Sequence, residues 1–263
     1  MNNDISPSLK KRFKALPKIE LHAHLHGSVR RSTLLALISE HQELIIPQVL
    51  LDPKSSLNLE SAFQLFDATH KAVNTISIVK RIATEALEDM RDDGVVYVEF
   101  RTTPRALPDG TSKAKYVEEL INLFIQWNKR YGRLQARLLI SLDRGKPVSD
   151  AQDTLRVIEP FVRAHRDILV GLDLSGDPRK GSFVDFMPLI KHGREQLGLK
   201  ISVHAAEVGQ SSDVADEDTE MTKILRFRPD RLGHALFLRN YHLALVISFL
   251  QIPLNPLYMN DRL

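Results

Sequence analysis

The feature that most constrains the fold is a regular alternation of short β-branched segments with longer helix-forming segments along the chain. The predicted strands are 19–25, 95–101, 134–143, 168–174, 199–204 and 231–234, and helix-forming sequence follows each of them. The predicted helices are 59–73, 76–92, 113–130, 151–165, 183–197 and 217–227. This alternation predicts a parallel sheet covered by helices, either a doubly wound α/β fold or a TIM-type (β/α)8 barrel.

The number of predicted strands indicates an incomplete barrel. The residues after 234 are too few for two further strand–helix units, and 252–254 fits only the beginning of a seventh strand. We therefore expect an α/β barrel that lacks strands 7–8, whose open sheet edges lower its stability. Because no linker-like composition divides the sequence, we expect a single, C-terminally incomplete domain over residues 1–263.

Composition excludes several classes of protein. The chain has no cysteine, which rules out disulfide scaffolds, cysteine nucleophiles and Cys-ligated metal centres. Its 36 basic and 33 acidic residues give a net charge of only +3, which argues against a nucleic-acid partner. The first 17 residues have no apolar leader core, and the apolar run 243–254 is too short to span a membrane. We expect a soluble, cytosolic monomer that acts on a small molecule.

Three histidines, His22, His24 and His26, are spaced two residues apart at the end of the first predicted strand. Residues at this spacing on a strand point to the same side of the sheet. The carboxyl ends of barrel strands open onto the active site, where imidazoles can bind a metal ion. Three histidines in this arrangement favour a metal site over a set of structural core histidines.

Two later strands end in similar motifs. His204 closes the predicted strand 199–204, and Glu207 follows in the loop, where a carboxyl group can act as a general acid or base. His234 closes the next strand, where it can orient a hydroxide or stabilise developing charge. Taken alone, His234 is more typical of a buried, hydrogen-bonded histidine. In combination, the three motifs predict a hydrolytic metal centre.

The motifs together resemble the adenosine deaminase family, and within it the adenosine deaminase-like branch, the N(6)-methyl-AMP deaminases. They are Leu-Pro-Lys-Ile-Glu-Leu-His-Ala-His-Leu-His-Gly-Ser, Arg-Thr-Thr-Pro-Arg, Gly-Leu-Asp-Leu-Ser-Gly-Asp-Pro, His-Ala-Ala-Glu and Arg-Leu-Gly-His. The resemblance covers about residues 16–254. It implies a (β/α)8 barrel with one zinc ion that hydrolyses the 6-amino or 6-alkylamino group of a purine nucleoside or nucleotide. The expected reaction converts N(6)-methyl-AMP to IMP and methylamine, a step of nucleotide metabolism.

The resemblance also implies the roles of individual residues. His22, His24 and His204 match the zinc ligands. Glu207 matches the proton donor to ring N1, and His234 matches the histidine that positions the attacking hydroxide. The positions that match substrate contacts are His24, His26, His70, Thr102, Thr103, Pro104, Arg105, Asp143 and Gly176.

The residue types support some of these substrate roles independently. Thr102, Thr103 and Arg105 follow the second predicted strand, and two hydroxyls with a guanidinium suit a phosphate, although a capped loop would also explain them. His70 lies within a predicted amphipathic helix and, taken alone, is typical of a packing histidine.

The sequence departs from the family after residue 234. The family's Asp-Asp pair, which supplies a further zinc ligand and a hydroxide-orienting carboxylate, has no counterpart, because Asp261 is the only acidic residue there. Ala235 replaces a glycine usual in the family. Three histidines can still hold zinc, with weaker affinity and catalysis expected. Two alternatives therefore stay open: a truncated, catalytically impaired isoform or pseudoenzyme, and another metal-dependent barrel hydrolase such as a phosphoesterase or amidase.

Overall fold

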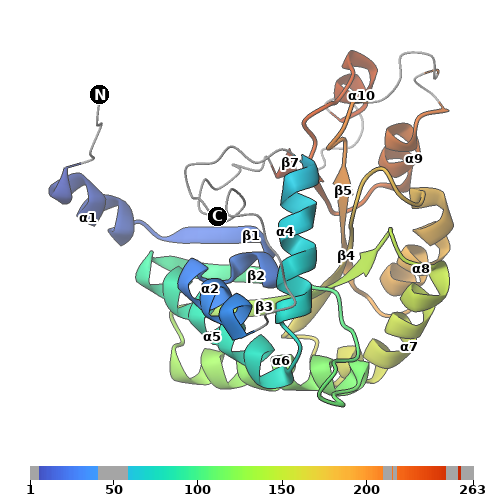
Figure 1. Cartoon of the computed structure of the whole chain (residues 1–263). Coiled ribbons are helices and arrows are strands. Elements are labelled where there is room, and N and C mark those ends of the chain that lie inside the picture. Colours follow the sequence, from blue (N-terminus) through green and yellow to red (C-terminus); the bar gives the residue numbers. More distant parts are fainter. Residues whose placement is uncertain (1–5, 41–58, 210–214, 216–217, 247–253, 256–263) are drawn as a thin grey trace. The chain divides into compact units, whose positions relative to one another are not determined.

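The computed structural model describes residues 6–40, 59–209, 215, 218–246 and 254–255 (Figure 1). The strands are β1 (Lys18–His24), β2 (Val95–Thr102), β3 (Gln135–Asp143), β4 (Leu169–Ser175), β5 (Lys200–Ala205), β6 (Arg231–His234) and β7 (Leu254–Asn255). The helices are α1 (Pro7–Ala15), the 3-10 helix η1 (His26–Ser28), α2 (Arg31–Glu40), α4 (Leu59–Ala72), α5 (Ile76–Asp92), α6 (Lys113–Arg130), α7 (Val148–Ala164), α8 (Phe183–Glu195), α9 (Glu220–Phe227) and α10 (Asn240–Leu245). Residue 217, the predicted beginning of a helix, and the predicted strand residues 252–253 lie outside the described part.

The strands form one sheet in the order β1-β2-β3-β4-β5-β6-β7. Each strand from β3 to β6 pairs in parallel with the next strand of the sequence. β7 adds only two residues to β6, through the pairs Leu232–Leu254 and Gly233–Asn255. A sheet in sequence order with helices between its strands is the arrangement of a (β/α)8 barrel. The predicted α/β barrel, incomplete at its C-terminal end, is confirmed.

The chain divides into two compact units. The first contains Met1–Phe100, Leu107–Thr111 and Glu119–Arg137, and the second contains Arg101–Ala106, Ser112–Glu118 and Leu138–Leu263. The single domain expected over residues 1–263 stays a prediction.

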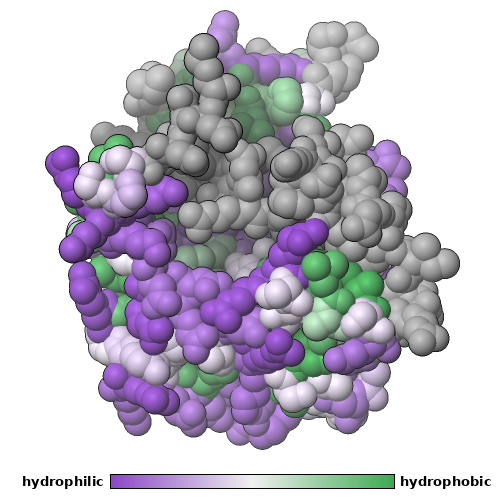
Figure 2. All heavy atoms as spheres, turned by 60° about the vertical axis from the view of Figure 1, so that its left-hand side comes forward, coloured by the Kyte–Doolittle hydropathy of each residue, from purple (hydrophilic) through white to green (hydrophobic). Residues whose placement is uncertain are grey.

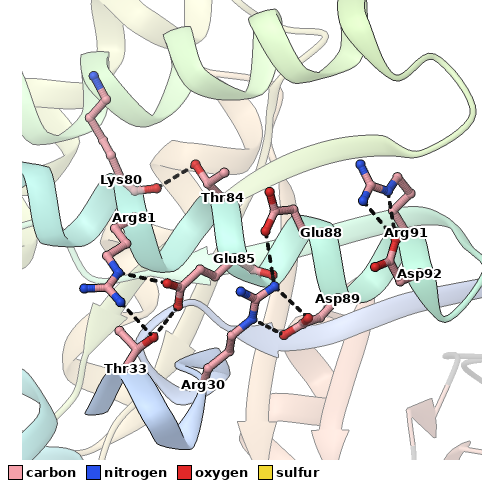
Figure 3. A network of polar contacts seen from close by, with 10 residues as sticks. All are labelled: Arg30, Thr33, Lys80, Arg81, Thr84, Glu85, Glu88, Asp89, Arg91 and Asp92. Atoms are coloured by element: carbon pink, nitrogen blue, oxygen red, sulfur yellow. Dashed lines mark hydrogen bonds and ion pairs between the residues drawn. The ribbon is translucent and has the colours of Figure 1, made fainter. Parts of the chain in front are cut away.

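In the first unit, α5 organises the chain that follows β1. Its buried residues, Val79, Ile82, Ala83, Ala86 and Leu87, recur at helical spacing and form one apolar face. The polar face of α5 contacts Arg30, just before α2, and Thr33 within α2 (Figure 3). Arg30 pairs with Asp89 of α5 at 2.8 Å, and Thr33 donates to Glu85 of α5 at 2.6 Å. Because η1 also contacts α4 and α5, the turn after β1 is held in place from both sides.

In the second unit, α7 packs on β4, while α8 and α9 pack on β5; α7 and α8 lie side by side (Figure 1). The packing of α8 on β4 is close, since a Cβ at Gly193 would lie 2.2 Å from Leu172 Cδ1. Ser182 and Thr219 cap the first turns of α8 and α9 by accepting bonds from the backbone N–H groups of Val184 and Thr222. These contacts fix the strand ends that carry the predicted site residues of this unit.

Apolar side chains gather in the interior of the described part, and Figure 2 shows one face on which hydrophilic residues occupy most of the coloured surface. None of the described helices has both the length and the apolar content needed to cross a membrane.

Candidate active site

The first unit holds the four predicted site histidines of the N-terminal half. His22 and His24 lie on β1, with ring centroids 5.6 Å apart, and His22 is buried. The backbone at this strand end is fixed by Ser28 Oγ, which donates to the carbonyl of His24 at 2.8 Å. His26 packs edge-to-face against His70 of α4, with ring centroids 4.8 Å apart. Two residues predicted to contact substrate from distant parts of the sequence are therefore neighbours.

The strand-based argument for His26 is wrong. The chain leaves β1 after His24, because Leu25 takes a right-handed helical conformation with φ −57° and ψ −48°. His26 then begins η1, so its side chain does not follow the two-residue alternation of His22 and His24. His26 instead reaches His70 from a helical turn, which is a tertiary contact that the local spacing does not encode.

In the second unit, His204 ends β5 beside a buried ion pair. Asp173 Oδ1 lies 3.2 Å from His204 Nδ1, and the same oxygen accepts a 2.7 Å bond from Arg101 Nη1. The Arg101 and Asp173 side chains are fully buried. Ser141 donates to the other carboxylate oxygen at 3.3 Å. A carboxylate at one ring nitrogen fixes the imidazole orientation and leaves the other nitrogen for a ligand, as in carboxylate–histidine–metal arrangements.

Sequence reasoning missed Arg101 and Asp173 as site residues. Both are charged residues within strands that otherwise bury apolar side chains. A charged residue in such a strand is rarely buried without a partner, and this was the signal that could have identified them.

Glu207 and His234 face each other, with Oε2 and Nε2 3.4 Å apart. The rings of His204 and His234 have centroids 5.0 Å apart, so the structure brings together all three predicted catalytic or metal-binding residues of this unit. The loop after β6 is joined to the end of β5 and the loop that follows it by two backbone hydrogen bonds of 2.9 Å. Ala235 N donates to Ala205 O, and Phe237 N donates to Ala206 O.

The backbone of these loops is strained. Ala206, His234 and Ala235 have φ values of 52°, 61° and 56°, a region that residues other than glycine rarely adopt. Each such residue adds an energetic cost that the surrounding structure must offset, a situation typical of functional sites.

Burial shifts the pKa values of Glu207 and His234 in opposite directions. It raises the pKa of the Glu207 carboxyl, although nearby His204 and Arg144 oppose the shift. Burial, followed by the effect of His204, lowers the pKa of His234 to about 3, although Asp173 opposes the shift. At neutral pH His234 is therefore an uncharged imidazole, and Glu207 binds a proton more readily than an exposed glutamate.

Thr102 ends β2, and Thr103 to Arg105 follow it. Thr102 is buried, and its Oγ1 lies 2.6 Å from the hydroxyl of Tyr116, whose pKa burial raises to about 12. Arg105 is half-buried, and desolvation lowers its pKa. Thr103 is half-buried and Pro104 buried in the same stretch. The predicted phosphate-binding segment thus combines a fixed hydroxyl with a cation that has lost part of its hydration.

Asp143 and Gly176 are in direct contact where β3 and β4 end. Asp143 Oδ1 accepts a 2.9 Å bond from Gly145 N, and a Cβ at Gly176 would lie 2.3 Å from the same oxygen. Gly176 has φ +105°, so both its conformation and its contact with Asp143 require glycine. These two residues, both predicted to contact substrate, are therefore neighbours.

The donor groups fit a zinc ion. The candidate ligands are imidazole nitrogens at strand ends, which zinc accepts readily, and His204 has a carboxylate beside its Nδ1. Of the sequence-predicted ligands, the first unit holds His22 and His24 on β1, and the second unit holds His204 on β5.

An incomplete α/β barrel with histidines and a buried carboxyl group at its strand ends has the features of a barrel hydrolase. The chain belongs to the adenosine deaminase family, whose model matches residues 17–240.

Its relatives include two N6-methyl-AMP deaminases. The N6-methyl-AMP deaminase-L of Xenopus laevis is 33% identical over 245 residues, which cover 92% of this chain and 69% of the relative. The human N6-methyl-AMP deaminase is 32% identical, with 87% of this chain and 63% of the relative covered. The chain thus spans about two thirds of the length of these relatives. The crystal structure of Arabidopsis ADAL complexed with IMP matches with 33% identity and a TM-score of 0.79, covering 94% of this chain and 72% of that one.

Proposed function

We propose that this chain hydrolyses N(6)-methyl-AMP, or a related 6-aminopurine nucleotide, with IMP and methylamine as the products. One water molecule is consumed, whose oxygen becomes the 6-oxo group while methylamine leaves. The observation that carries this proposal is the pairing of Glu207 with His234 at 3.4 Å, beside His204. The similarity to N6-methyl-AMP deaminases and to a relative with bound IMP supports the choice of substrate.

We propose that His22, His24 and His204 bind one zinc ion. When bound, zinc lowers the pKa of a water molecule and so supplies a nucleophile at neutral pH. The positions of the three histidines support this assignment: β1 and β5 belong to one sheet, and the active sites of such barrels lie at the carboxyl ends of their strands. Asp173 supports it further, because a carboxylate at Nδ1 of His204 holds that imidazole in a fixed orientation.

Glu207 and His234 would act on protons. Attack at C6 places negative charge on the purine ring, and a protonated Glu207 can neutralise it by donating to N1. The raised pKa of this buried carboxyl keeps the proton available. His234 is uncharged, so the ring nitrogen that carries no proton can accept a hydrogen bond from the attacking water and orient it.

The remaining predicted residues would bind the nucleotide. Arg105 and the hydroxyl groups of Thr102 and Thr103 are proposed to hold the phosphate, beside Pro104. The backbone of Gly176 and the carboxylate of Asp143 would meet the base, and the neighbouring His26 and His70 would contact substrate in the first unit. We further propose a cytosolic monomer without nucleic-acid or membrane partners, an expectation that the small net charge of +3 supports.

The test is a zinc-supplemented deamination assay of the purified chain on N(6)-methyl-AMP, AMP and adenosine. We expect IMP from N(6)-methyl-AMP, and a loss of about 100-fold or more in Glu207→Gln. Glu195→Gln, which alters an exposed glutamate of α8, is the matched control and should retain full activity. Undiminished turnover in Glu207→Gln would contradict the proposed mechanism.

The second candidate is a catalytically impaired form of such a deaminase. Such a chain would bind zinc and IMP and yield no product from any of the three substrates. Direct measurement of zinc content and IMP binding on the same preparation separates it from an unfolded chain.

A further inference from the structure

Arg144, the residue after β3, is almost completely buried, with 5% of its side chain exposed. Its guanidinium group donates from Nε to Lys180 O at 2.8 Å and from Nη2 to Gly181 O at 3.1 Å. These two carbonyls are consecutive in the loop 176–182, which joins β4 to α8. The planar guanidinium can hold both at once, which the single ammonium of a lysine cannot do with the same geometry.

The same loop contacts residues 143–144 at both of its ends. At one end, a Cβ at Gly176 would lie 2.3 Å from Asp143 Oδ1. At the other, a Cβ at Gly181, which has φ +59°, would lie 2.2 Å from Arg144 O. Arg144 N also donates to Ser175 O at 2.8 Å. The loop is therefore fitted closely against the end of β3 by its backbone, and the Arg144 side chain closes its far end.

Glu220 connects this arrangement to two helices. Its Oε1 accepts a 2.7 Å bond from Arg144 Nη2 and another 2.7 Å bond from Phe183 N, the first residue of α8. Glu220 is itself the first residue of α9, where a negative charge is favourable near the helix N-terminus. One carboxylate oxygen thus couples Arg144 to the beginnings of α8 and α9.

We infer that Arg144 is a positioning residue for base recognition: it fixes the loop 176–182 so that the Gly176 backbone and the Asp143 carboxylate form a rigid surface for the purine ring. This inference rests on the proposed function, because that function assigns the base to Gly176 and Asp143. Arg144 contacts the loop through its guanidinium group, and besides its electrostatic effect on Glu207 it acts on base recognition through the loop. Its loss should therefore weaken binding of the base selectively and leave binding of the ribose phosphate unchanged.

The test compares Arg144→Lys and Arg144→Gln with the matched variant Arg194→Lys. Arg194 makes the same kinds of contact in the same unit, donating to Phe227 O at 3.1 Å and Arg228 O at 2.7 Å, and lies 3.8 Å from Asp230. Hydrogen–deuterium exchange of the ligand-free chain measures the order of the loop 176–182. Equilibrium titrations with IMP and with ribose 5-phosphate, which lacks the base, measure recognition of each part of the nucleotide.

We expect faster exchange in the loop for both Arg144 variants and an IMP dissociation constant raised about tenfold or more. Ribose 5-phosphate should bind as before, and Arg194→Lys should alter neither measurement. Equal weakening of both ligands, or unchanged exchange in the loop, would contradict the positioning role. A wild-type chain that binds ribose 5-phosphate and IMP equally would contradict the proposed function itself, independently of how the variants behave.

Discussion

Asp173 lies 3.2 Å behind His204, with its Oδ1 facing the Nδ1 of the imidazole. The same carboxylate receives Arg101 and Ser141, so its charge is compensated within a fully buried cluster. A single buried acid therefore orients a proposed metal ligand and neutralises a cation at the same time. Loss of this carboxylate should affect both zinc binding and folding.

Substituting Asp173→Asn tests that dual role. Zinc affinity should fall about 10–100-fold, because the imidazole loses its orienting carboxylate. The free energy of unfolding should fall by about 3–5 kcal/mol, since Arg101 stays buried without its countercharge. Competition with a chromogenic chelator and urea unfolding measure the two effects. Asp153→Asn, which removes a half-exposed partner of Lys113, should change neither appreciably.

Substituting Gly176→Ala tests the contact with Asp143. The added Cβ would overlap the carboxylate in a conformation that already disfavours alanine, so we expect destabilisation of about 2–4 kcal/mol. Gly110→Ala is the matched control: Gly110 has φ +87° with nothing within 4 Å of the added Cβ, so only the conformational cost of about 1–2 kcal/mol applies. Equal losses in urea unfolding would show that the overlap relaxes freely.

Substituting Ala235→Gly should stabilise the chain by about 0.5–1 kcal/mol. Ala235 has φ 56°, and glycine adopts this region without the steric cost that alanine carries. The control, Ala164→Gly at the last residue of α7, should be destabilising by about the same amount. Chemical denaturation of the two variants gives the comparison, and a loss of stability in Ala235→Gly would contradict the strain argument.

Arg105→Gln tests the phosphate assignment. The proposed bond between guanidinium and phosphate predicts that turnover of N(6)-methyl-AMP falls about 10–100-fold more than turnover of N(6)-methyladenosine. The exposed Arg163→Gln of α7 serves as the control for charge alone. Equal losses of turnover on the nucleotide and on the nucleoside would show that Arg105 does not bind the phosphate.

The contacts of Glu85 predict a pH dependence of stability. Burial acts to raise the pKa of Glu85, but hydrogen bonds from Thr33 and Arg81 outweigh it and hold the pKa below its ordinary value. The carboxylate therefore stabilises the fold fully above its unfolded-state pKa of about 4.3, and this contribution is lost as pH falls through the lower folded value. Thr33→Val should lower stability at pH 7 and lower it less at pH 3, as followed by urea unfolding at both pH values. A difference that is independent of pH would contradict this linkage.

The order of strands and helices and most of the site could be predicted from the sequence, because both are local. Hydrophobic periodicity located β2 to within one residue and gave the bounds of α5 and α6 correctly. Histidines at strand ends identified His204 and His234, which the structure places side by side. The pairing of Arg101 with Asp173 could not be predicted, because it joins residues 72 positions apart in the sequence.

The backbone hydrogen bonds from Ala235 N to Ala205 O and from Phe237 N to Ala206 O connect the loop after β5 with the loop after β6. The positions of Glu207 and His234 are therefore coupled, because a displacement of one loop also displaces the other. Variants of this chain designed for other amine leaving groups should therefore have both loops replaced together.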